Sequence, residues 1–229
     1  MILTDPEWQA VLLSLKVSSL AVVCSVPFGV LFAWLLVRRN FPGKALLDGL
    51  IHLPLVLPPV VVGYLLLVAM GRRGIIGAWL YDWLGISFAF SWRGAVMAAA
   101  VMSFPLMVRA IRLALEGVDV KLEQAARTLG AGRWRVFCTI TLPLMLPGII
   151  VGTVLAFARS LGEFGATITF VSNIPGETRT IPSAMYTLIQ IPGGESAAAR
   201  LCLISIVLAL ISLMVSEWLA RASRKRIGA

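Results

Sequence analysis

Side chains that commonly perform catalysis are scarce in this chain. Its one histidine, His52, lies between apolar residues, so a Ser-His-Asp arrangement has no support. The three cysteines show no metal-ligand spacing. A phosphate-binding G-x-x-x-x-G-K-[ST] loop is absent, because Gly43-Lys44 lacks the upstream glycine and is followed by alanine. We therefore expect no catalytic residue, no metal site and no cofactor bound by this chain, and an energy source supplied by a partner.

The polar residues around 160 have a spacing that suits charge neutralisation next to an apolar run. Arg159 and Glu163 are four residues apart, so on a helix they would form an ion pair. Such a pair is either plain scaffold or part of a gate. Hydroxyls such as Ser103 and Thr169 are candidates for a polar path, although packing between helices is the commoner role of each. The candidate gate or pathway residues are Arg159, Ser160, Gly162, Glu163, Gly165 and Thr167.

The segment EGVDVKLEQAARTLGAGRWRVFCTITLP (116–143) predicts a short amphipathic helix. Asp119 is a good N-cap, residues 120–129 have helical periodicity, and Gly130 is placed to end the helix in a left-handed conformation. The residues alone leave two roles open: a helix lying on lipid headgroups, or a helix that inserts into a groove of a soluble partner. Its apolar face consists of Leu122, Ala125, Ala126 and Leu129.

Helices that cross a membrane must position these segments. Of the 229 residues, 59% are hydrophobic and 14% are charged, against about 25% charged in ordinary soluble domains. A helix needs about 20 apolar residues to cross the hydrocarbon core, where every backbone polar group must be bonded internally. We expect an all-α integral membrane protein with a single transmembrane domain over residues 1–229. The five expected spans are approximately 11–37, 46–70, 94–115, 142–161 and 198–219.

The net charge of +9 indicates membrane topology rather than nucleic-acid binding. Basic residues lie in short blocks between apolar runs and form no continuous stripe with interleaved aromatics. Positive charge favours the cytoplasmic side. With an outside N-terminus, most of the 20 Lys and Arg residues, including the C-terminal basic block, fall on cytoplasmic flanks. We therefore expect a lipid bilayer and no nucleic acid as partner, a cytoplasmic C-terminus, and a cytoplasmic loop over 116–141.

Proline is dense within the expected spans. Each proline either kinks a continuous helix that its neighbours stabilise, or interrupts a helix beside a translocation path. Six prolines in one small chain favour the second interpretation. A further short helix is expected in IPSAMYTLIQI, within the long outer segment 162–197. The span prolines are Pro27, Pro54, Pro58, Pro59, Pro105 and Pro147.

The loop 116–141 and the residues after it resemble a signature of binding-protein-dependent ABC importer permeases. That family has Glu-Ala-Ala, a glycine four residues on, and a hydrophobic-Leu-Pro about a dozen residues later. Here Glu123-Gln124-Ala125-Ala126 is followed by Gly130 and Leu142-Pro143. The runs LPLVLPPVVVGYLLL, RRGIIGAWL and RSLGEFGATITFVSNIPGETRTIPSAMY look like the molybdate branch of the family, with sulfate permeases close by.

The resemblance implies a type I ABC importer permease whose coupling helix docks into a cleft of an ATPase subunit. Expected partners are a second copy of the chain in a homodimer, two cytoplasmic ATPase subunits that use the ATP, and a periplasmic or extracellular molybdate-binding protein. Expected function is oxyanion import across the cytoplasmic (inner) membrane, with molybdate favoured and sulfate, thiosulfate or tungstate as alternatives. The residues that the resemblance assigns to coupling are Glu123, Ala125, Ala126, Gly130, Leu142 and Pro143.

Two rival classes lack support in the sequence. A membrane-embedded enzyme acting on lipid would need paired acid/base or metal-binding residues near one interface, and we find none. A self-sufficient secondary transporter would normally have a second half with matching hydropathy, and no repeat is present. The sequence therefore favours a pore-forming subunit over an enzyme.

Overall fold

The computed structural model describes residues 3–227, apart from the side chains at 216, 220 and 222–227, and every regular element in this range is a helix. The predicted all-α fold class is confirmed. Four helices, or five if α2 and α3 count as one bent span, are long and apolar enough to cross a membrane. The basic residues at 224–226 lie outside the described side chains. The spans are α1 (Asp5–Arg38), α2 (Lys44–Val56) with α3 (Pro59–Met70), α5 (Trp92–Glu116), the run Arg133–Leu161 that ends in α8 (Leu142–Leu161), and α11 (Glu195–Ile227).

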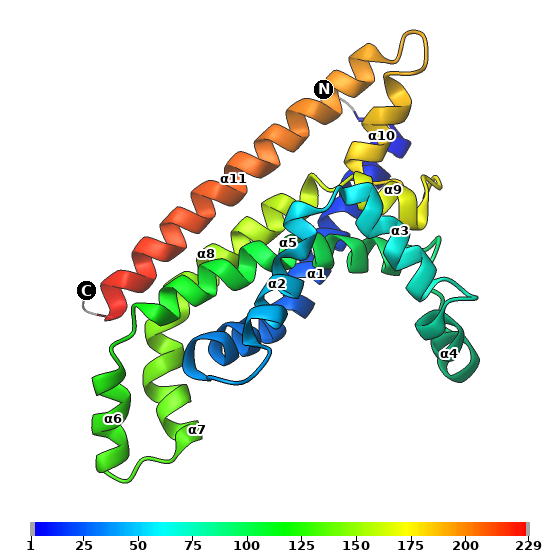
Figure 1. Cartoon of the computed structure of the whole chain (residues 1–229). Coiled ribbons are helices and arrows are strands. Elements are labelled where there is room, and N and C mark those ends of the chain that lie inside the picture. Colours follow the sequence, from blue (N-terminus) through cyan, green and yellow to red (C-terminus); the bar gives the residue numbers. More distant parts are fainter. Residues whose placement is uncertain (1–2, 228–229) are drawn as a thin grey trace.

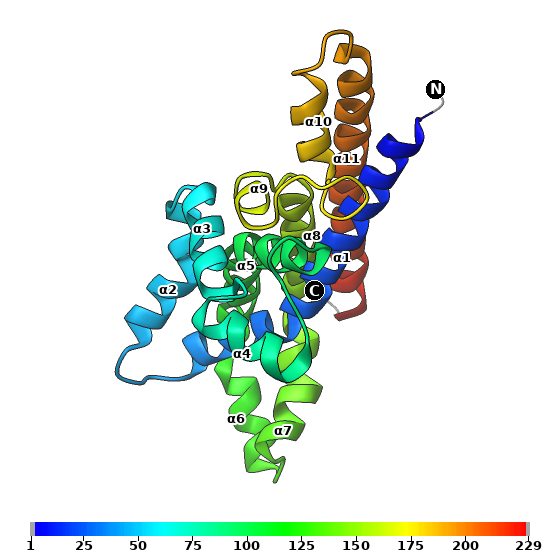
Figure 2. The same ribbon diagram turned by 90° about the vertical axis from the view of Figure 1, so that its right-hand side faces the viewer.

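The long helices form a bundle with short helices at both ends (Figure 1). α5 packs along α1 and α8, and α11 packs along α8. At one end, α6 (Val120–Thr128) and α7 (Arg133–Val136) project away from the bundle; α10 (Ile181–Leu188) and the first turns of α11 lie at the opposite end (Figures 1 and 2). The sequence predicts a cytoplasmic loop over 116–141 and an outer segment over 162–197, and these two segments are spatially separate.

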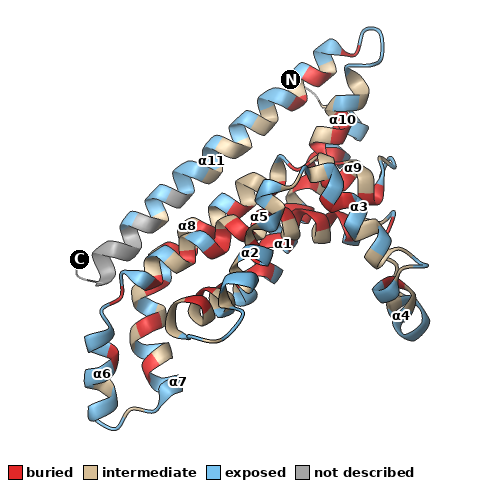
Figure 3. Ribbon diagram, in the orientation of Figure 1, coloured by how far each residue is buried: buried red, intermediate tan, exposed pale blue. Residues whose placement is uncertain are grey.

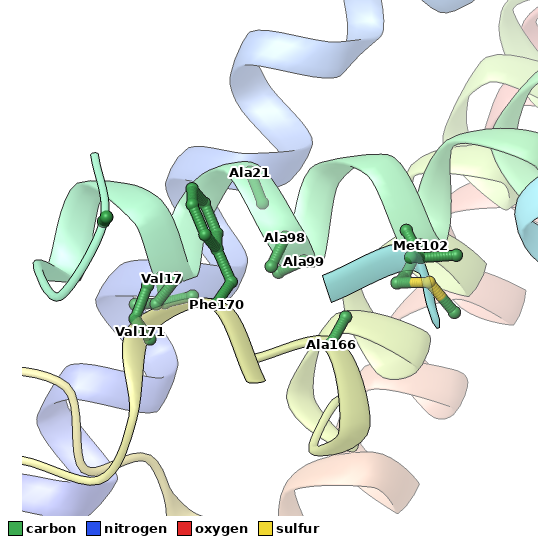
Figure 4. Packing of buried hydrophobic residues seen from close by; sticks show 11 residues of the cluster. Val17, Ala21, Ala98, Ala99, Met102, Ala166, Phe170 and Val171 are labelled. Atoms are coloured by element: carbon green, nitrogen blue, oxygen red, sulfur yellow. The ribbon is translucent and has the colours of Figure 1, made fainter. Parts of the chain in front are cut away.

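A well-packed core lies where α1, α5 and α9 (Gly165–Val171) meet (Figure 4). Ala21, Ala98, Ala99 and Ala166 are almost completely buried there around Phe170. Small residues let helix backbones approach closely, which is the usual way helices associate in lipid. In contrast, α11 carries many exposed apolar side chains (Figure 3), which suits contact with lipid or with a second subunit.

The expected span over 46–70 is not one straight helix, because the chain bends by 117° between α2 and α3, which form either a broken span or a re-entrant loop. Leu57 is extended, as residues before proline usually are, and α3 begins at Pro59 after Pro58. Two consecutive prolines remove two backbone donors, so helical hydrogen bonding cannot continue through them. The remaining span prolines (Pro27, Pro54, Pro105 and Pro147) lie inside helices. The interpretation of prolines as helix breaks therefore holds only at 58–59.

The connections contain more helix than the sequence predicts. The expected short helix in IPSAMYTLIQI is confirmed as α10. α9 and the exposed α4 (Ile75–Leu84) were not expected, because each is too short for periodicity to distinguish it from a loop. The fourth span also begins earlier than residue 142, since helical structure is continuous from Arg133.

An ion pair at the α10 end connects the start of the first span to the start of the last span. α1 begins before the expected residue 11, in a capping box where the backbone N–H of Thr4 donates to Glu7 Oε2 at 2.7 Å. The other oxygen of Glu7 accepts from Arg200 Nη2 of α11, also at 2.7 Å. The two longest helices are thus held together by a buried carboxylate.

Candidate functional site

α6 forms as the sequence predicts, one residue shorter than the expected range 120–129. Asp119 accepts a hydrogen bond from the backbone N–H of Lys121 at 2.9 Å and so caps the first turn. At the other end, Gly130 has a φ of +85°. This left-handed conformation is costly for residues with a Cβ atom, so a glycine is the natural residue to end the helix.

The apolar face of α6 is left uncovered by the described part of the chain. Leu122 is 49% exposed, Leu129 is 89% exposed, and Ala125 is also exposed. The helix projects beyond the bundle rather than lying along it (Figure 2). An apolar patch on a projecting helix is typical of a surface that binds a partner.

Glu123 points into the chain and is only 6% exposed. Its Oε1 accepts hydrogen bonds from Arg38 Nη2 at 3.0 Å and from Thr141 Oγ1 at 2.9 Å. Arg38 Nη2 also donates to the carbonyl of Val118 at 3.2 Å. Because Arg38 ends α1 and Thr141 immediately precedes α8, one carboxylate joins three segments. We call Arg38, Glu123 and Thr141 the Glu123 bracket.

Thr141 lies in a π turn, η1 (Phe137–Thr141), within the run Arg133–Leu161. The backbone N–H of Leu142 donates to the carbonyl of Phe137, five residues earlier. Pro143 gives a physical reason for the wider turn: in a regular helix its ring would clash with the carbonyl four residues before it. Such local adjustments commonly accommodate proline in membrane helices.

Two threonines of this turn use their hydroxyls differently. Thr139 donates back to the carbonyl of Arg135 in its own helix at 2.6 Å, which is the usual behaviour in membrane helices. Thr141 donates instead to Glu123 on another segment. The hydroxyl of Thr141 therefore contributes a tertiary contact rather than a local one.

The six residues that the resemblance assigns to coupling have two kinds of environment. Ala125, Gly130 and Pro143 are exposed and Ala126 is partly exposed, so a partner could reach them. Leu142 packs against the buried cluster of α1, α5 and α8, and Glu123 is buried in its bracket. Arg38 and Thr141 were missed by sequence reasoning, because they lie 85 and 18 residues from Glu123 and no local pattern indicates either contact.

A second buried carboxylate lies at the other end of α8. Glu163 is 3% exposed, and its Oε2 is 2.7 Å from Arg159 Nη1, so the ion pair expected from the spacing is present. Its Oε1 accepts from the backbone N–H of Ala166 at 2.8 Å. Glu163 therefore also caps the start of α9, a role that the sequence did not indicate.

Gly162 and Gly165, the two glycines next to this pair, have different roles. A Cβ atom on Gly165 would lie 2.8 Å from Pro59 Cβ, and one on Gly63 would lie 2.5 Å from the carbonyl oxygen of Ala166. These glycines let α3 and α9 cross at close range. Gly162 has open space around it, with Arg159 O at 4.0 Å as the nearest contact. Gly165 is therefore a packing position rather than a point of flexibility.

The candidate pathway hydroxyls differ in whether they bond to a carbonyl of their own helix. Ser103 donates to the carbonyl of Ala99 at 2.7 Å and Thr169 to that of Gly165 at 2.8 Å, so both are bonded within their own helices. Thr167 is buried in α9. The Oγ of Ser160 is buried and has no hydrogen-bond partner among the described residues. Ser160 therefore differs from Ser103 and Thr169, because no described residue satisfies its buried hydroxyl.

A largely apolar groove of about 470 Å³ lies between α1, α2 and α5. Arg93 is the one charged residue that lines it, and Phe28, Phe32 and Phe104 are among its apolar walls. None of the candidate gate residues lines this groove. Among the residues that the structure describes, no group of three or more His, Cys, Asp or Glu could hold a metal ion.

Curated bacterial permeases match almost the whole chain. The molybdenum transport system permease protein ModB of Escherichia coli (strain K12) is 87% identical over 228 residues, covering 100% of both chains. The protein of the same name from Haemophilus influenzae is 65% identical over 222 residues, covering 97% of both. A sulfate transport system permease protein, CysT of Escherichia coli (strain K12), is 36% identical over 231 residues, covering 99% of this chain and 82% of its own.

Solved structures and a family profile agree with these matches. A bacterial ABC transporter involved in the import of the acidic polysaccharide alginate superposes with a TM-score of 0.75 at 20% identity, over 96% of this chain and 80% of that chain. This similarity supports the fold of an ABC importer permease. The profile of the binding-protein-dependent transport system inner membrane component matches residues 25–227. The chain therefore belongs to this family of multi-pass inner membrane transport subunits.

Proposed function

We propose that this chain is the permease subunit of an ATP-driven importer that moves an oxyanion, molybdate first of all, across the cytoplasmic membrane. The observation that carries the substrate assignment is the 87% identity to a molybdenum transport permease over 100% of both chains. The motifs at 53–67, 72–80 and 159–186 resemble the same branch of the family. We further propose that residues 1–229 act as one transmembrane unit.

The partners follow from the exposed face of α6. Leu122 and Leu129 are exposed on a helix that projects from the bundle, so α6 would insert into a cleft of a soluble ATPase subunit. Two copies of the chain would form a homodimer around the pore, because closed two-fold symmetry is the usual way for a small subunit to enclose a path. Each copy would bind one ATPase, and a molybdate-binding protein would deliver substrate to the opposite face.

The proposed orientation places α6 and α7 in the cytoplasm and α10 outside, with an outside N-terminus and a cytoplasmic C-terminus. Arg133 and Arg135 in α7 and Arg38 and Arg39 at the end of α1 all lie toward the α6 end. This distribution supports a cytoplasmic location for that end, because positive charge is retained there.

In the proposed cycle the ATPase subunits approach one another when they bind ATP, which brings the two α6 helices together and turns the pore outward. Hydrolysis and release would reverse the motion. The outer ends of α8 and α9 would form part of the gate, and the Arg159–Glu163 pair and Gly165 would be its structural scaffold. Ser160 and Thr167 would lie beside the path and bind the anion weakly, since conduction requires release as well as entry.

Accumulation of molybdenum tests the substrate. We would delete the gene, restore it on a plasmid, and measure cellular molybdenum at submicromolar molybdate, with and without excess sulfate. Molybdate is supported if deletion abolishes molybdenum accumulation, if the plasmid restores accumulation, and if excess sulfate does not reduce the restored accumulation. Unchanged molybdenum together with poor growth on sulfate as sole sulfur source would move the protein to the sulfate branch, which the 36% identity to a sulfate permease makes the second candidate.

Co-purification tests the ATPase contact. Leu129→Glu places a charge on the exposed apolar face of α6, and should prevent the ATPase subunit from purifying with the permease. Gln124→Glu adds the same charge at an exposed position outside the apolar face, and is the matched control. Retention of the ATPase by Leu129→Glu would remove this face from the interface.

A further inference from the structure

The Glu123 bracket has features that a partner contact would not have. If Glu123 served mainly to bind a soluble partner, its carboxylate would be accessible, yet the residue is 6% exposed. Its hydrogen bonds go to α1 and to η1 of the same chain. The exposed apolar residues of α6 lie on other positions of the helix.

The bracket is the one described point where α6, α1 and the run leading into α8 share a polar group. Arg38 bonds to both the side chain of Glu123 and the carbonyl of Val118, just before α6. Thr141 holds the same carboxylate oxygen from the side of α8. A displacement of α6 must therefore move the ends of α1 and α8 with it, or break a buried ion pair.

Breaking that pair is unfavourable, which makes the connection stiff. Removing one partner of a buried ion pair leaves an uncompensated charge. Arg38 is especially dependent on Glu123, because its Nε is already buried without a hydrogen-bond partner in the described part of the chain. The position of Glu123 in the first turn of α6 adds attraction to the helix N-terminus.

We propose that Arg38, Glu123 and Thr141 are positioning residues that transmit the motion of α6 to α1 and α8. The exposed face of α6 holds the ATPase, while the bracket converts the displacement of α6 into displacement of the spans. This inference rests on the proposed function, because it assumes that an ATPase moves α6. It assigns docking and transmission to different residues of one short helix.

The test uses the full complex of permease, ATPase and binding protein in proteoliposomes, and measures anion imported per ATP hydrolysed. Thr141→Val keeps the shape of the side chain and removes only its hydroxyl, and Glu123→Gln keeps the size and removes the charge. We expect the ATPase to stay bound and active in both, while import per ATP falls roughly tenfold. Glu116→Gln, in an exposed pair with Arg112 at the same end of the bundle, should leave the ratio unchanged.

A double substitution tests whether Arg38 and Glu123 act as one unit. If Arg38 and Glu123 act together, Arg38→Gln combined with Glu123→Gln should be no worse than either alone, since no unpaired charge remains. An unchanged ratio in Thr141→Val and Glu123→Gln would overturn the proposal. Loss of ATPase binding in Glu123→Gln would also overturn it, by making Glu123 a docking residue. The ratio is read with whichever oxyanion the wild-type complex imports, so a wrong substrate assignment would be detected separately in the wild type.

Discussion

A buried glutamate paired with an arginine lies beside each end of α8, but the two pairs join residues at very different separations in the sequence. At the end that is outer in the proposed orientation, Glu163 and Arg159 are four residues apart, and the remaining carboxylate oxygen caps the adjacent α9. At the α6 end, Glu123 and Arg38 are 85 residues apart and belong to different helices. The first pair stabilises one corner of the chain, whereas the second connects separate helices. We therefore expect damage to the outer pair to reduce stability, and damage to the Glu123 bracket to reduce coupling.

The largest effect should come from Glu123→Lys. This change places a second cation beside the partly buried Arg38, so the bracket cannot form and import should fall below detection. Insertion into the membrane should persist, because α6 lies outside the bundle. Uptake of the anion in cells, normalised to the amount of permease in the membrane, checks this prediction. Normal uptake at normal abundance would remove the bracket from the mechanism.

Glu163→Ala should reduce stability and leave coupling intact, the opposite of Glu123→Lys. It leaves Arg159 and the N–H of Ala166 without their acceptor, so thermal stability should fall by the equivalent of about 2–3 kcal/mol, less than for a fully buried pair because Arg159 is partly solvated. Import per ATP by the surviving protein should stay unchanged. Melting in detergent is best followed by tryptophan fluorescence, because the three free cysteines are exposed and would react with thiol dyes while the protein is folded. A large fall in import per ATP in Glu163→Ala would show that the Arg159–Glu163 pair also contributes to coupling.

Gly63→Ala tests the packing beside the outer pair. The added methyl group would lie 2.5 Å from the carbonyl oxygen of Ala166, so α3 and α9 must separate. Overpacking of this kind costs about 1–3 kcal/mol. Gly162→Ala, in open space nearby, is the control and should leave the melting temperature unchanged. Equal stability of the two variants would show that α3 and α9 do not need to be in close contact.

The smallest effect on stability should come from Gly130, at the exposed end of α6. Its φ of +85° is unfavourable for valine by about 1–2 kcal/mol, whereas asparagine tolerates this region. Gly130→Val should lower the affinity of the ATPase and leave the melting temperature of the bundle nearly unchanged. Gly130→Asn should resemble the wild type in both measurements. A similar loss of affinity in both variants would indicate that the partner needs the absence of a side chain, rather than the backbone angle.

The same contrast of local and distant contacts separates what the sequence could predict from what it could not. The Arg159–Glu163 pair, the Asp119 cap and the left-handed Gly130 depend on neighbours within a few residues, and all three are present. The bend within 46–70 could not be located from hydropathy, because hydropathy continues through Pro58 and Pro59 although the helix is interrupted there. The ties of Glu123 to Arg38 and of Glu7 to Arg200 join residues 85 and 193 positions apart, which periodicity cannot connect.

The π turn before Pro143 changes the register between α7 and α8. A turn closed over five residues holds one residue more than an ordinary helical turn, while the helix on either side keeps its course. The side chains of α7 and α8 are therefore in phase with each other only if one residue between 137 and 141 is left out of the count. Homologous helices that lack this surplus residue should align with a single gap here.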